Sequence, residues 1–487
     1  MAGGVGEPTG QLIGGEFVAG GAAEPLPLVD PSSGERTGEI SAASAADVDR
    51  AVALAATAGR EQWTLKPPAE RGRVLAAAAA AIRERAEELA ELDVSDAGLP
   101  RWMARADAEN AARYFEFFAG AADKLHGETI PLGEEWVDFT LREPWGVCGV
   151  ITPFNVPLQM MARSIAPALA TGNTAVVKVA EQAPLAPLAL GRVLHEAGVP
   201  AAALAVLTGT GAESGARLTA HPDVAHLTFT GSLPTGRAVL HAAAERVVPA
   251  VIELGGKSPQ IVFDDADLDA AAAAIVGSGL RTAGQVCSAG SRVLAQRGVY
   301  EELLAKLGEL TAGIRVGPAA EDPDMGPLVS ARQQQQVREA IAAAEAAGER
   351  LLAGGSTPVE GVPEGGFFVR PTVFADVAPD GPLAQEEIFG PVLAAIPFAD
   401  AAEAVEIAEN TPFGLVAGVW TADVGRAMAV SKRLSAGQVF VNNYGVGGGV
   451  ELPFGGYRQS GIGREKGVEA LRSYTQLKNV CVRATLQ

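Results

Sequence analysis

The spacing of apolar residues divides the first quarter of the chain into two kinds of segment. Residues 11–40 alternate short apolar pieces with Gly and Pro, which predicts strands and turns. From Ala46 to Ala119 apolar residues recur at every third and fourth position, which predicts helices. Pro67 and Pro68 separate a first helix from a second helix over residues 70–92.

Strand-like and helix-like segments then alternate. The stretch 136–152 first alternates and then becomes continuously apolar, as a hairpin leading into a buried strand would. This alternation of strands and helices is typical of a doubly wound parallel sheet. The elements predicted in chain order are a strand at 146–152, a helix from Met160, a strand at 174–180, a helix from Pro187, a strand at 204–209, a helix near Ser214 and a strand at 226–231.

The same alternation repeats after Glu253 and predicts a second α/β domain. Its first elements are a strand at 259–263, a helix from Leu268, a strand at 291–296 and a helix from Tyr300. The tail 473–484 is strand-like and has no apolar core of its own. A strand of this kind can pair with another subunit at an exposed sheet edge.

The amino-acid composition indicates which kinds of molecule the protein can bind. The chain has 487 residues, with 48% hydrophobic and 20% charged side chains, which fits a globular protein of two or three domains. The net charge of −20 disfavours nucleic acid and anionic membranes and favours a small-molecule partner. Three cysteines make no disulfide framework and suit the cytoplasm. We expect no signal peptide, no membrane span and no metal site.

Three residues have settings that suit covalent catalysis, and each also has a structural interpretation. Cys287 lies among small residues that leave room for a tetrahedral adduct, although a buried structural cysteine fits the fragment as well. Glu253 ends a strand before two glycines, where a carboxylate can activate water or cap the next segment. Asn155 follows an apolar strand, where its amide can donate to an oxyanion or cap a helix.

Several segments are candidates for binding a nucleotide cofactor. Residues 208–215 read G-x-G-x-x-x-G, which departs from the usual dinucleotide fingerprint. Ser232 precedes a predicted helix, whose N-terminus can hold a pyrophosphate. Lys178 and Glu181 lie at the carboxyl end of a predicted strand, where nucleotides bind in such sheets. Taken singly, these charges could equally be solvated loop residues.

Six motifs in this order resemble those of the aldehyde dehydrogenase superfamily, and the resemblance covers nearly the whole chain. The glutamate of ELGGKSP lies 34 positions (287 − 253) before the cysteine of GQVC, a specific spacing. The motifs are TPFN (152–155), FTGS (229–232), ELGGKSP (253–259), GQVCSAGSR (284–292), EEIFGPV (386–392) and PFGGYRQSGIGRE (453–465).

The resemblance implies a role for each matching residue. Cys287 would be the nucleophile and Glu253 the general base, while Asn155 and the backbone N–H of Cys287 would form the oxyanion hole. The cofactor would be NAD, with NADP as the alternative, because a carboxylate at Glu181 repels a 2′-phosphate. The residues implied in cofactor binding are Lys178, Glu181, Gly211, Phe229, Ser232, Glu387 and Phe389.

The resemblance also implies a domain organisation. A Rossmann-like cofactor domain would comprise residues 1–122 and 143–252, and an α/β catalytic domain residues 253–455. A small hairpin at 123–142 and the tail 473–487 would serve oligomerisation, as a homodimer or a homotetramer.

The chain departs from the family pattern at three places. Val179 replaces the usual proline after Lys178. Ser164 stands where many relatives have the lysine that has been cast as relay partner of the acid matching Glu465. The loop 443–451 is glycine-rich where several relatives place an aromatic residue, which suggests an open or adaptable substrate entrance.

The substrate is an aldehyde whose identity the motifs leave open. Arg163 lies on the helix that lines the family's substrate tunnel, and it either binds a substrate carboxylate or makes a structural salt bridge. Met160 and Phe454 are further candidates for the substrate pocket. The alternatives are a CoA-acylating dehydrogenase and an inactive binding protein on the same fold. The intact set of catalytic residues argues against both.

Overall fold

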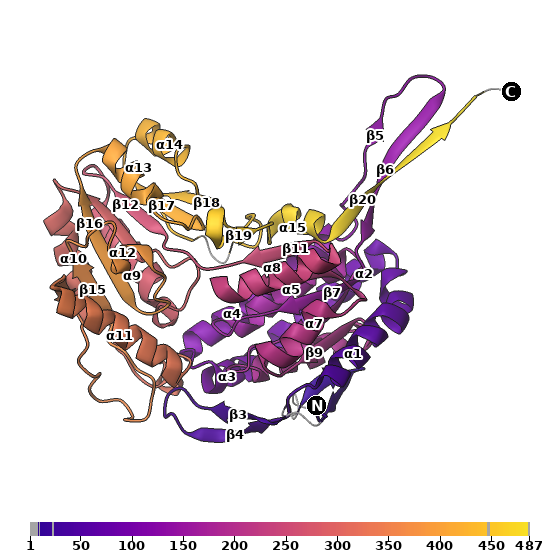
Figure 1. The fold of residues 1–487 in the computed structure, drawn as a ribbon, viewed down its shortest axis with the longest axis horizontal. Coiled ribbons are helices and arrows are strands. Elements are labelled where there is room, and N and C mark those ends of the chain that lie inside the picture. The colour runs from indigo at the N-terminus through magenta and orange to yellow at the C-terminus, as the bar shows by residue number, and fades with distance from the viewer. Residues whose placement is uncertain (1–7, 9, 22–23, 446–448, 486–487) are drawn as a thin grey trace.

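The computed structural model describes residues 8, 10–21, 24–445 and 449–485. This part of the chain forms two large sheets covered by helices and two small sheets, which confirms the predicted α/β class. The large sheets lie in separate halves of the molecule, one indigo to magenta and the other rose to orange (Figure 1). The described residues contain no helix that is long and apolar enough to cross a membrane.

The first large sheet has eight strands in the order β19-β11-β10-β7-β8-β9-β1-β2. Strands β11, β10, β7, β8 and β9 run parallel, so their carboxyl ends meet at one edge of the sheet. The predicted strands of this region are therefore confirmed. The strand bounds are β1 Gln11–Ile13, β2 Glu16–Val18, β7 Val147–Ile151, β8 Thr174–Lys178, β9 Leu204–Leu207, β10 Val224–Thr230, β11 Ala250–Glu253 and β19 Gly461–Ile462.

Helices pack on both faces of this sheet. α2, α4, α5 and α6 share one apolar core, and α1, α7 and α8 share another. The single helix predicted over 70–92 is wrong, because Arg85 leaves the helical region (φ −113°, ψ 19°) and separates α2 from α3. The bounds are α1 Ala45–Leu54, a π-helical turn η1 Ala55–Thr64, α2 Pro68–Glu84, α3 Ala86–Asp96, α4 Arg101–Ala121, α5 Pro157–Ala170, α6 Leu185–Glu196, η2 Gly211–Gly215, α7 Ala216–Ala220 and α8 Leu233–Arg246.

The second large sheet has seven strands in the order β14-β15-β16-β13-β12-β17-β18. All but β14 run parallel, with α9 and α10 packed in one apolar core and α11, α13 and α14 in another. The bounds are β12 Pro259–Val262, α9 Leu268–Leu280, η3 Arg281–Gly284, β13 Arg292–Gln296, α10 Tyr300–Ala312, η4 Ala319–Glu321, α11 Ala331–Ala347, β14 Arg350–Ala353, β15 Thr372–Ala375, α12 Pro382–Gln385, β16 Val392–Phe398, α13 Ala401–Glu409, β17 Val416–Trp420, α14 Val424–Ser431 and β18 Gln438–Val441.

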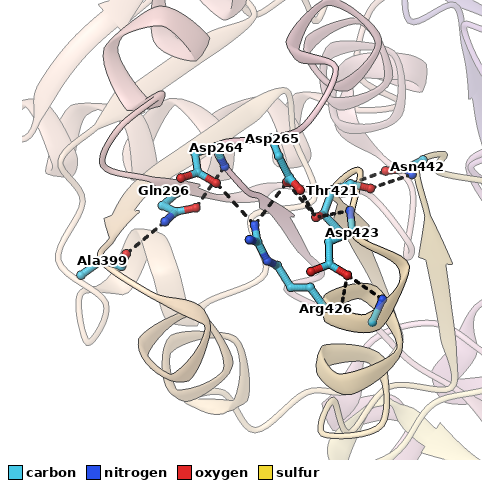
Figure 2. A network of polar contacts seen from close by, with 9 residues as sticks. Asp264, Asp265, Gln296, Ala399, Thr421, Asp423, Arg426 and Asn442 are labelled. Carbon is cyan, nitrogen blue, oxygen red and sulfur yellow. Dashed lines mark hydrogen bonds and ion pairs between the residues drawn. The ribbon is translucent and has the colours of Figure 1, made fainter.

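A polar network joins the carboxyl ends of these parallel strands (Figure 2). Thr421, after β17, donates its hydroxyl to Asp265, after β12, at 2.7 Å. Arg426 reaches the same carboxylate at 3.2 Å, and Asp423 caps α14. The network therefore stabilises the carboxyl edge of the second sheet. The segments that lead into β12 and β13 lie at the opposite, amino edge.

A ribbon of three strands, in the order β20-β6-β5, stands off the body of the molecule (Figure 1). The tail strand β20 pairs with β6 of its own chain along its full length. Its other edge pairs with no strand of the described chain. The remaining bounds are β5 Thr129–Ile130, β6 Trp136–Pro144, β20 Thr475–Arg483, β3 Leu26–Val29, β4 Arg36–Ile40, η5 Arg458–Ser460 and α15 Gly467–Ser473.

Candidate active site

The three predicted catalytic residues meet where the two large sheets face each other. Glu253 is the last residue of β11 and Asn155 follows β7, so both lie at the carboxyl edge of the first sheet. Cys287 precedes β13 and therefore lies at the amino edge of the second sheet. Ligands bind outside the carboxyl ends of strands in open parallel sheets, and Glu253 and Asn155 have that position in the first sheet.

A left-handed turn presents Cys287. Thr282, Ala283 and Gly284 have φ values of 51°, 51° and 71°. A Cβ at Gly284 would lie 2.1 Å from the carbonyl oxygen of Gly390, so this position requires glycine. The side-chain amide of Asn155 donates to the carbonyl oxygen of Gln285 at 2.8 Å, which holds the amide beside the cysteine segment.

Glu253 is a buried carboxylate without a hydrogen-bond partner among the described residues. Its side chain is 1% exposed. Burial raises the pKa of Glu253 to about 8, although the positive charge of Arg163 opposes this rise. A carboxylate with a pKa near neutrality is suited to take a proton from water.

Arg163 is engaged in a buried ion pair with Glu465. Its guanidinium also lies 3.8 Å from a carboxylate oxygen of Glu253. The hydroxyl of Ser164 donates to the second oxygen of Glu465 at 3.0 Å. The position of the missing lysine is thus occupied by a serine that reaches the same acid. This contact joins residues 301 positions apart, and the sequence linked the two positions only through the lysine of the family pattern.

The Cys287 thiol is partly buried beside these charges. Burial raises the pKa of Cys287 to about 11, and the positive charge of Arg163 opposes this effect. The resting thiol is therefore protonated at neutral pH and needs a proton acceptor before it can attack.

A cavity of about 430 Å³ lies on one side of Cys287, within the size range of small-molecule sites. Glu387 lies against the backbone at Gly255, where a Cβ would be 1.7 Å from its carboxylate. Phe389 adopts a left-handed φ of 53°, and its ring meets that of Phe154 edge-on at 5.9 Å. The lining includes the predicted residues Asn155, Ser232, Cys287, Glu387 and Phe389. It also includes Met160, which was predicted for the substrate pocket and does not line the second cavity described below.

Four of the predicted cofactor residues do not line this cavity, namely Lys178, Glu181, Gly211 and Phe229, whereas Ser232 does. Lys178 ends β8 and lies 3.4 Å from Glu181, so the pair occupies the carboxyl edge of the sheet. Ser232 is the N-cap residue of α8, but its hydroxyl lies near Thr235 and makes no capping hydrogen bond. Phe229 is buried in the sheet core, and Gly211 is exposed at the start of η2.

A second cavity, of about 310 Å³, lies on the other side of the cysteine segment. Val286 and Ser288 line it, whereas Cys287 lines the cofactor-side cavity. Phe454 was predicted here, but Tyr444 was not. The Tyr444 hydroxyl donates to the carbonyl of Ser288 at 2.8 Å, so the described part of loop 443–451 supplies an aromatic wall. Residues 446–448 of this loop lie outside the described residues.

Across the described ranges, no group of three or more His, Cys, Asp or Glu side chains is arranged to hold a metal ion.

Comparisons with known proteins show which family the chain belongs to. The family model described as the aldehyde dehydrogenase family matches residues 17–480. A betaine aldehyde dehydrogenase of Cereibacter sphaeroides is 44% identical over 97% of this chain and 96% of its own length. An aldehyde dehydrogenase of Aspergillus niger is 42% identical over 97% of this chain and 95% of its own length.

Solved structures agree with these sequence matches. A putative aldehyde dehydrogenase from Burkholderia cenocepacia has a TM-score of 0.96 at 51% identity, covering 98% of this chain and 100% of that one. An indole-3-acetaldehyde dehydrogenase of Pseudomonas syringae, solved with NAD+, has a TM-score of 0.95 at 37% identity, covering 98% of this chain and 97% of that one. The chain therefore belongs to the aldehyde dehydrogenase family.

Proposed function

We propose that this protein oxidises an aldehyde to the carboxylic acid with NAD, through a thioester on Cys287. The assignment to Cys287 rests on one observation. Cys287 lines the first cavity, which we assign to the cofactor, whereas Val286 and Ser288 line the second, which we assign to the aldehyde. An aldehyde entering from one cavity and a nicotinamide entering from the other would meet at the sulfur. Direct hydride transfer requires this arrangement.

In the first half-reaction, the thiol of Cys287 gives its proton to water, and its sulfur bonds to the aldehyde carbon. The carbonyl oxygen becomes an alkoxide, which accepts hydrogen bonds from the Asn155 amide and the Cys287 backbone N–H. NAD held in the cavity of Glu387 and Phe389 would supply the acceptor for the hydride from this carbon. The carbon remains attached to Cys287 as a thioester.

In the second half-reaction, Glu253 takes a proton from water as the water oxygen bonds to the thioester carbon. The carbon–sulfur bond then breaks, which releases the acid and returns the Cys287 thiolate. The absence of hydrogen-bond partners on Glu253 in the described chain leaves both its oxygens available for water. Transfer of the acyl group to CoA would not need a base that activates water. The presence of Glu253 therefore argues against a CoA-acylating dehydrogenase.

We assign the cofactor site to the cavity that holds Glu387 and Phe389, with Lys178 and Glu181 on the adenosine ribose. NAD is the proposed cofactor, since Glu181 would repel the 2′-phosphate of NADP. Comparing kcat/KM for the two cofactors tests this choice, and an equal or higher value with NADP overturns it. NAD+ complexes of structurally similar dehydrogenases agree with the choice.

The predicted domain bounds and oligomeric state are carried forward as proposals. Residues 1–122 and 143–252 would bind the cofactor, and residues 253–455 would supply the nucleophile. The ribbon formed by 123–142 and 473–487 would join subunits of a dimer or a tetramer. The uncovered edge of β20 supports that role.

Substitution of each cysteine in turn tests the nucleophile. Cys287→Ala should abolish NADH formation, whereas Cys148→Ala and Cys481→Ala should retain most activity. Cys148 is buried in β7 and Cys481 is exposed on β20, so both lie outside the described cavities. Iodoacetamide labelling with mass spectrometry gives a second measurement. Loss of activity on labelling Cys148 alone would contradict the assignment.

A further inference from the structure

Four aromatic side chains lie in the wall of the second cavity, which is the substrate side of the proposed site, beside polar and small residues. Trp102, Phe440, Tyr444 and Phe454 all line it. Aromatic walls of this kind accept a flat apolar body, but they do not by themselves select its charge. The charged groups on the same walls therefore decide which aldehydes bind best.

Two charged side chains line this cavity, Asp107 and Lys466. The Asp107 carboxylate is buried and accepts hydrogen bonds from the backbone N–H groups of Leu158 and Gln159 at 2.9 and 3.1 Å. Its oxygens are thus directed to the amino end of α5. Burial raises the pKa of Asp107 to about 7 and lowers the pKa of Lys466 to about 8, so at neutral pH Lys466 keeps more of its charge than Asp107 does.

Lys466 is held at the cavity by its backbone and by Phe454. It precedes α15 with a left-handed φ of 63°, directly after Glu465. Glu465 and Phe454 exchange two backbone hydrogen bonds of 2.7 Å, which fix the two segments together. The ammonium lies 4.9 Å from the centroid of the Phe454 ring, within cation–π distance.

Arg163 does not compete for this role. Its guanidinium also lies over the Phe454 ring, at 4.6 Å, but it is paired with Glu465 and does not line the cavity. Lys466 does line the cavity, so its ammonium can reach a molecule bound there.

We propose that Lys466 is a specificity-determining residue that binds an anionic group of the substrate, so that the protein prefers aldehydes carrying a carboxylate on an aromatic body. This inference rests on the proposed function of the site. An ammonium at the aromatic wall attracts a carboxylate and repels a cation. The protein should therefore differ from its betaine aldehyde dehydrogenase relatives, since betaine aldehyde carries a permanent positive charge.

A matched pair of aldehydes tests the proposal. NADH formation is measured with benzaldehyde and 4-carboxybenzaldehyde, which share a ring and differ in charge. Lys466→Met should lower the ratio of kcat/KM for the charged over the neutral aldehyde by about tenfold to hundredfold. Lys466→Arg should restore most of the ratio. The control Lys432→Met, at the exposed end of α14, should leave the ratio unchanged.

Other results would overturn the proposal. If Lys466→Met lowers kcat/KM for both aldehydes equally, the residue supports catalysis generally and does not select charge. A wild-type preference for betaine aldehyde over 4-carboxybenzaldehyde would be equally decisive against it.

A binding measurement separates this inference from the proposed function. Terephthalate and benzoate are titrated into Cys287→Ala protein, with Trp102 at the cavity wall as a fluorescence reporter. Lys466→Met in this background should weaken terephthalate binding more than benzoate binding. If wild-type protein oxidises no aldehyde, the proposed function fails while this titration still tests Lys466. Equal weakening of both ligands overturns the inference alone.

Discussion

At the scale of single residues, the reactivity of the site depends on how burial shifts its acids. Glu253 ends a buried strand, and its charged form loses solvation without gaining hydrogen bonds. The pKa of about 8 that results from burial makes Glu253 a base near neutral pH. Below that pH the carboxyl holds a proton and cannot accept one from water, so kcat should rise as the pH increases through about 8.

Glu253→Gln should therefore separate the two half-reactions. The variant should still give a burst of NADH, because hydride transfer needs the Cys287 thiolate, whose proton can pass to water, and does not need Glu253. Steady-state turnover should then fall by about 10²- to 10⁴-fold, and it should lose the rise near pH 8. Stopped-flow fluorescence measures both phases. Disappearance of the burst itself would show that Glu253 acts earlier, in deprotonating Cys287.

Arg163 offers a second prediction at this scale. Arg163→Leu should reduce activity on charged and neutral aldehydes alike, because it removes the partner of Glu465 and a neighbour of Glu253. It should also destabilise the fold by about 3–5 kcal/mol, since a buried charge is left unpaired. Thermal and urea unfolding measure this loss. Arg350→Leu, which removes an exposed ion pair with Glu301, is the control and should change stability little.

A different outcome would revive the other interpretation of Arg163. If Arg163→Leu loses activity on carboxylated aldehydes alone and keeps its stability, then Arg163 binds substrate. In that case, the assignment of charge selection to Lys466 would need revision.

At the scale of elements, the turn before Cys287 shows why backbone geometry matters to the chemistry. Gly284→Ala places a Cβ against the Gly390 carbonyl, in a left-handed conformation that alanine rarely adopts. The turn must shift, so we expect slower iodoacetamide labelling of Cys287 and a smaller NADH burst. Gly120→Ala, in α4 with open space around it, is the matched control and should behave as wild type. An unchanged burst in Gly284→Ala would contradict this account.

The elements also show what sequence could and could not predict. Apolar runs such as residues 174–180 predicted β8 because both faces of a central parallel strand are buried. The break at Arg85 was missed because the apolar spacing continues across it. The contact of Arg163 with Glu465 depends on tertiary packing, and no local pattern encodes it. Lys466 was overlooked because it follows directly after the last recognised motif.

At the scale of the whole molecule, the ribbon β20-β6-β5 extends away from the core (Figure 1). It carries exposed apolar side chains. Val137 and Val482 are cross-strand partners, and they are 53% and 47% exposed. Such a surface on an uncovered sheet edge favours association with another protein. A second copy of the same chain would cover it in a closed symmetric arrangement.

The oligomeric state tests this interpretation directly. Light scattering coupled to size exclusion should give a mass for the wild type that is two or four times the 49.8 kDa of one chain. The double variant Val137→Asp, Val482→Asp places two carboxylates side by side on the ribbon and should shift the mass towards that of one chain. Leu310→Asp, on the exposed side of α10, is the control and should retain the wild-type mass. A wild-type mass of one chain, or an unchanged mass in the double variant, would show that the ribbon does not join subunits.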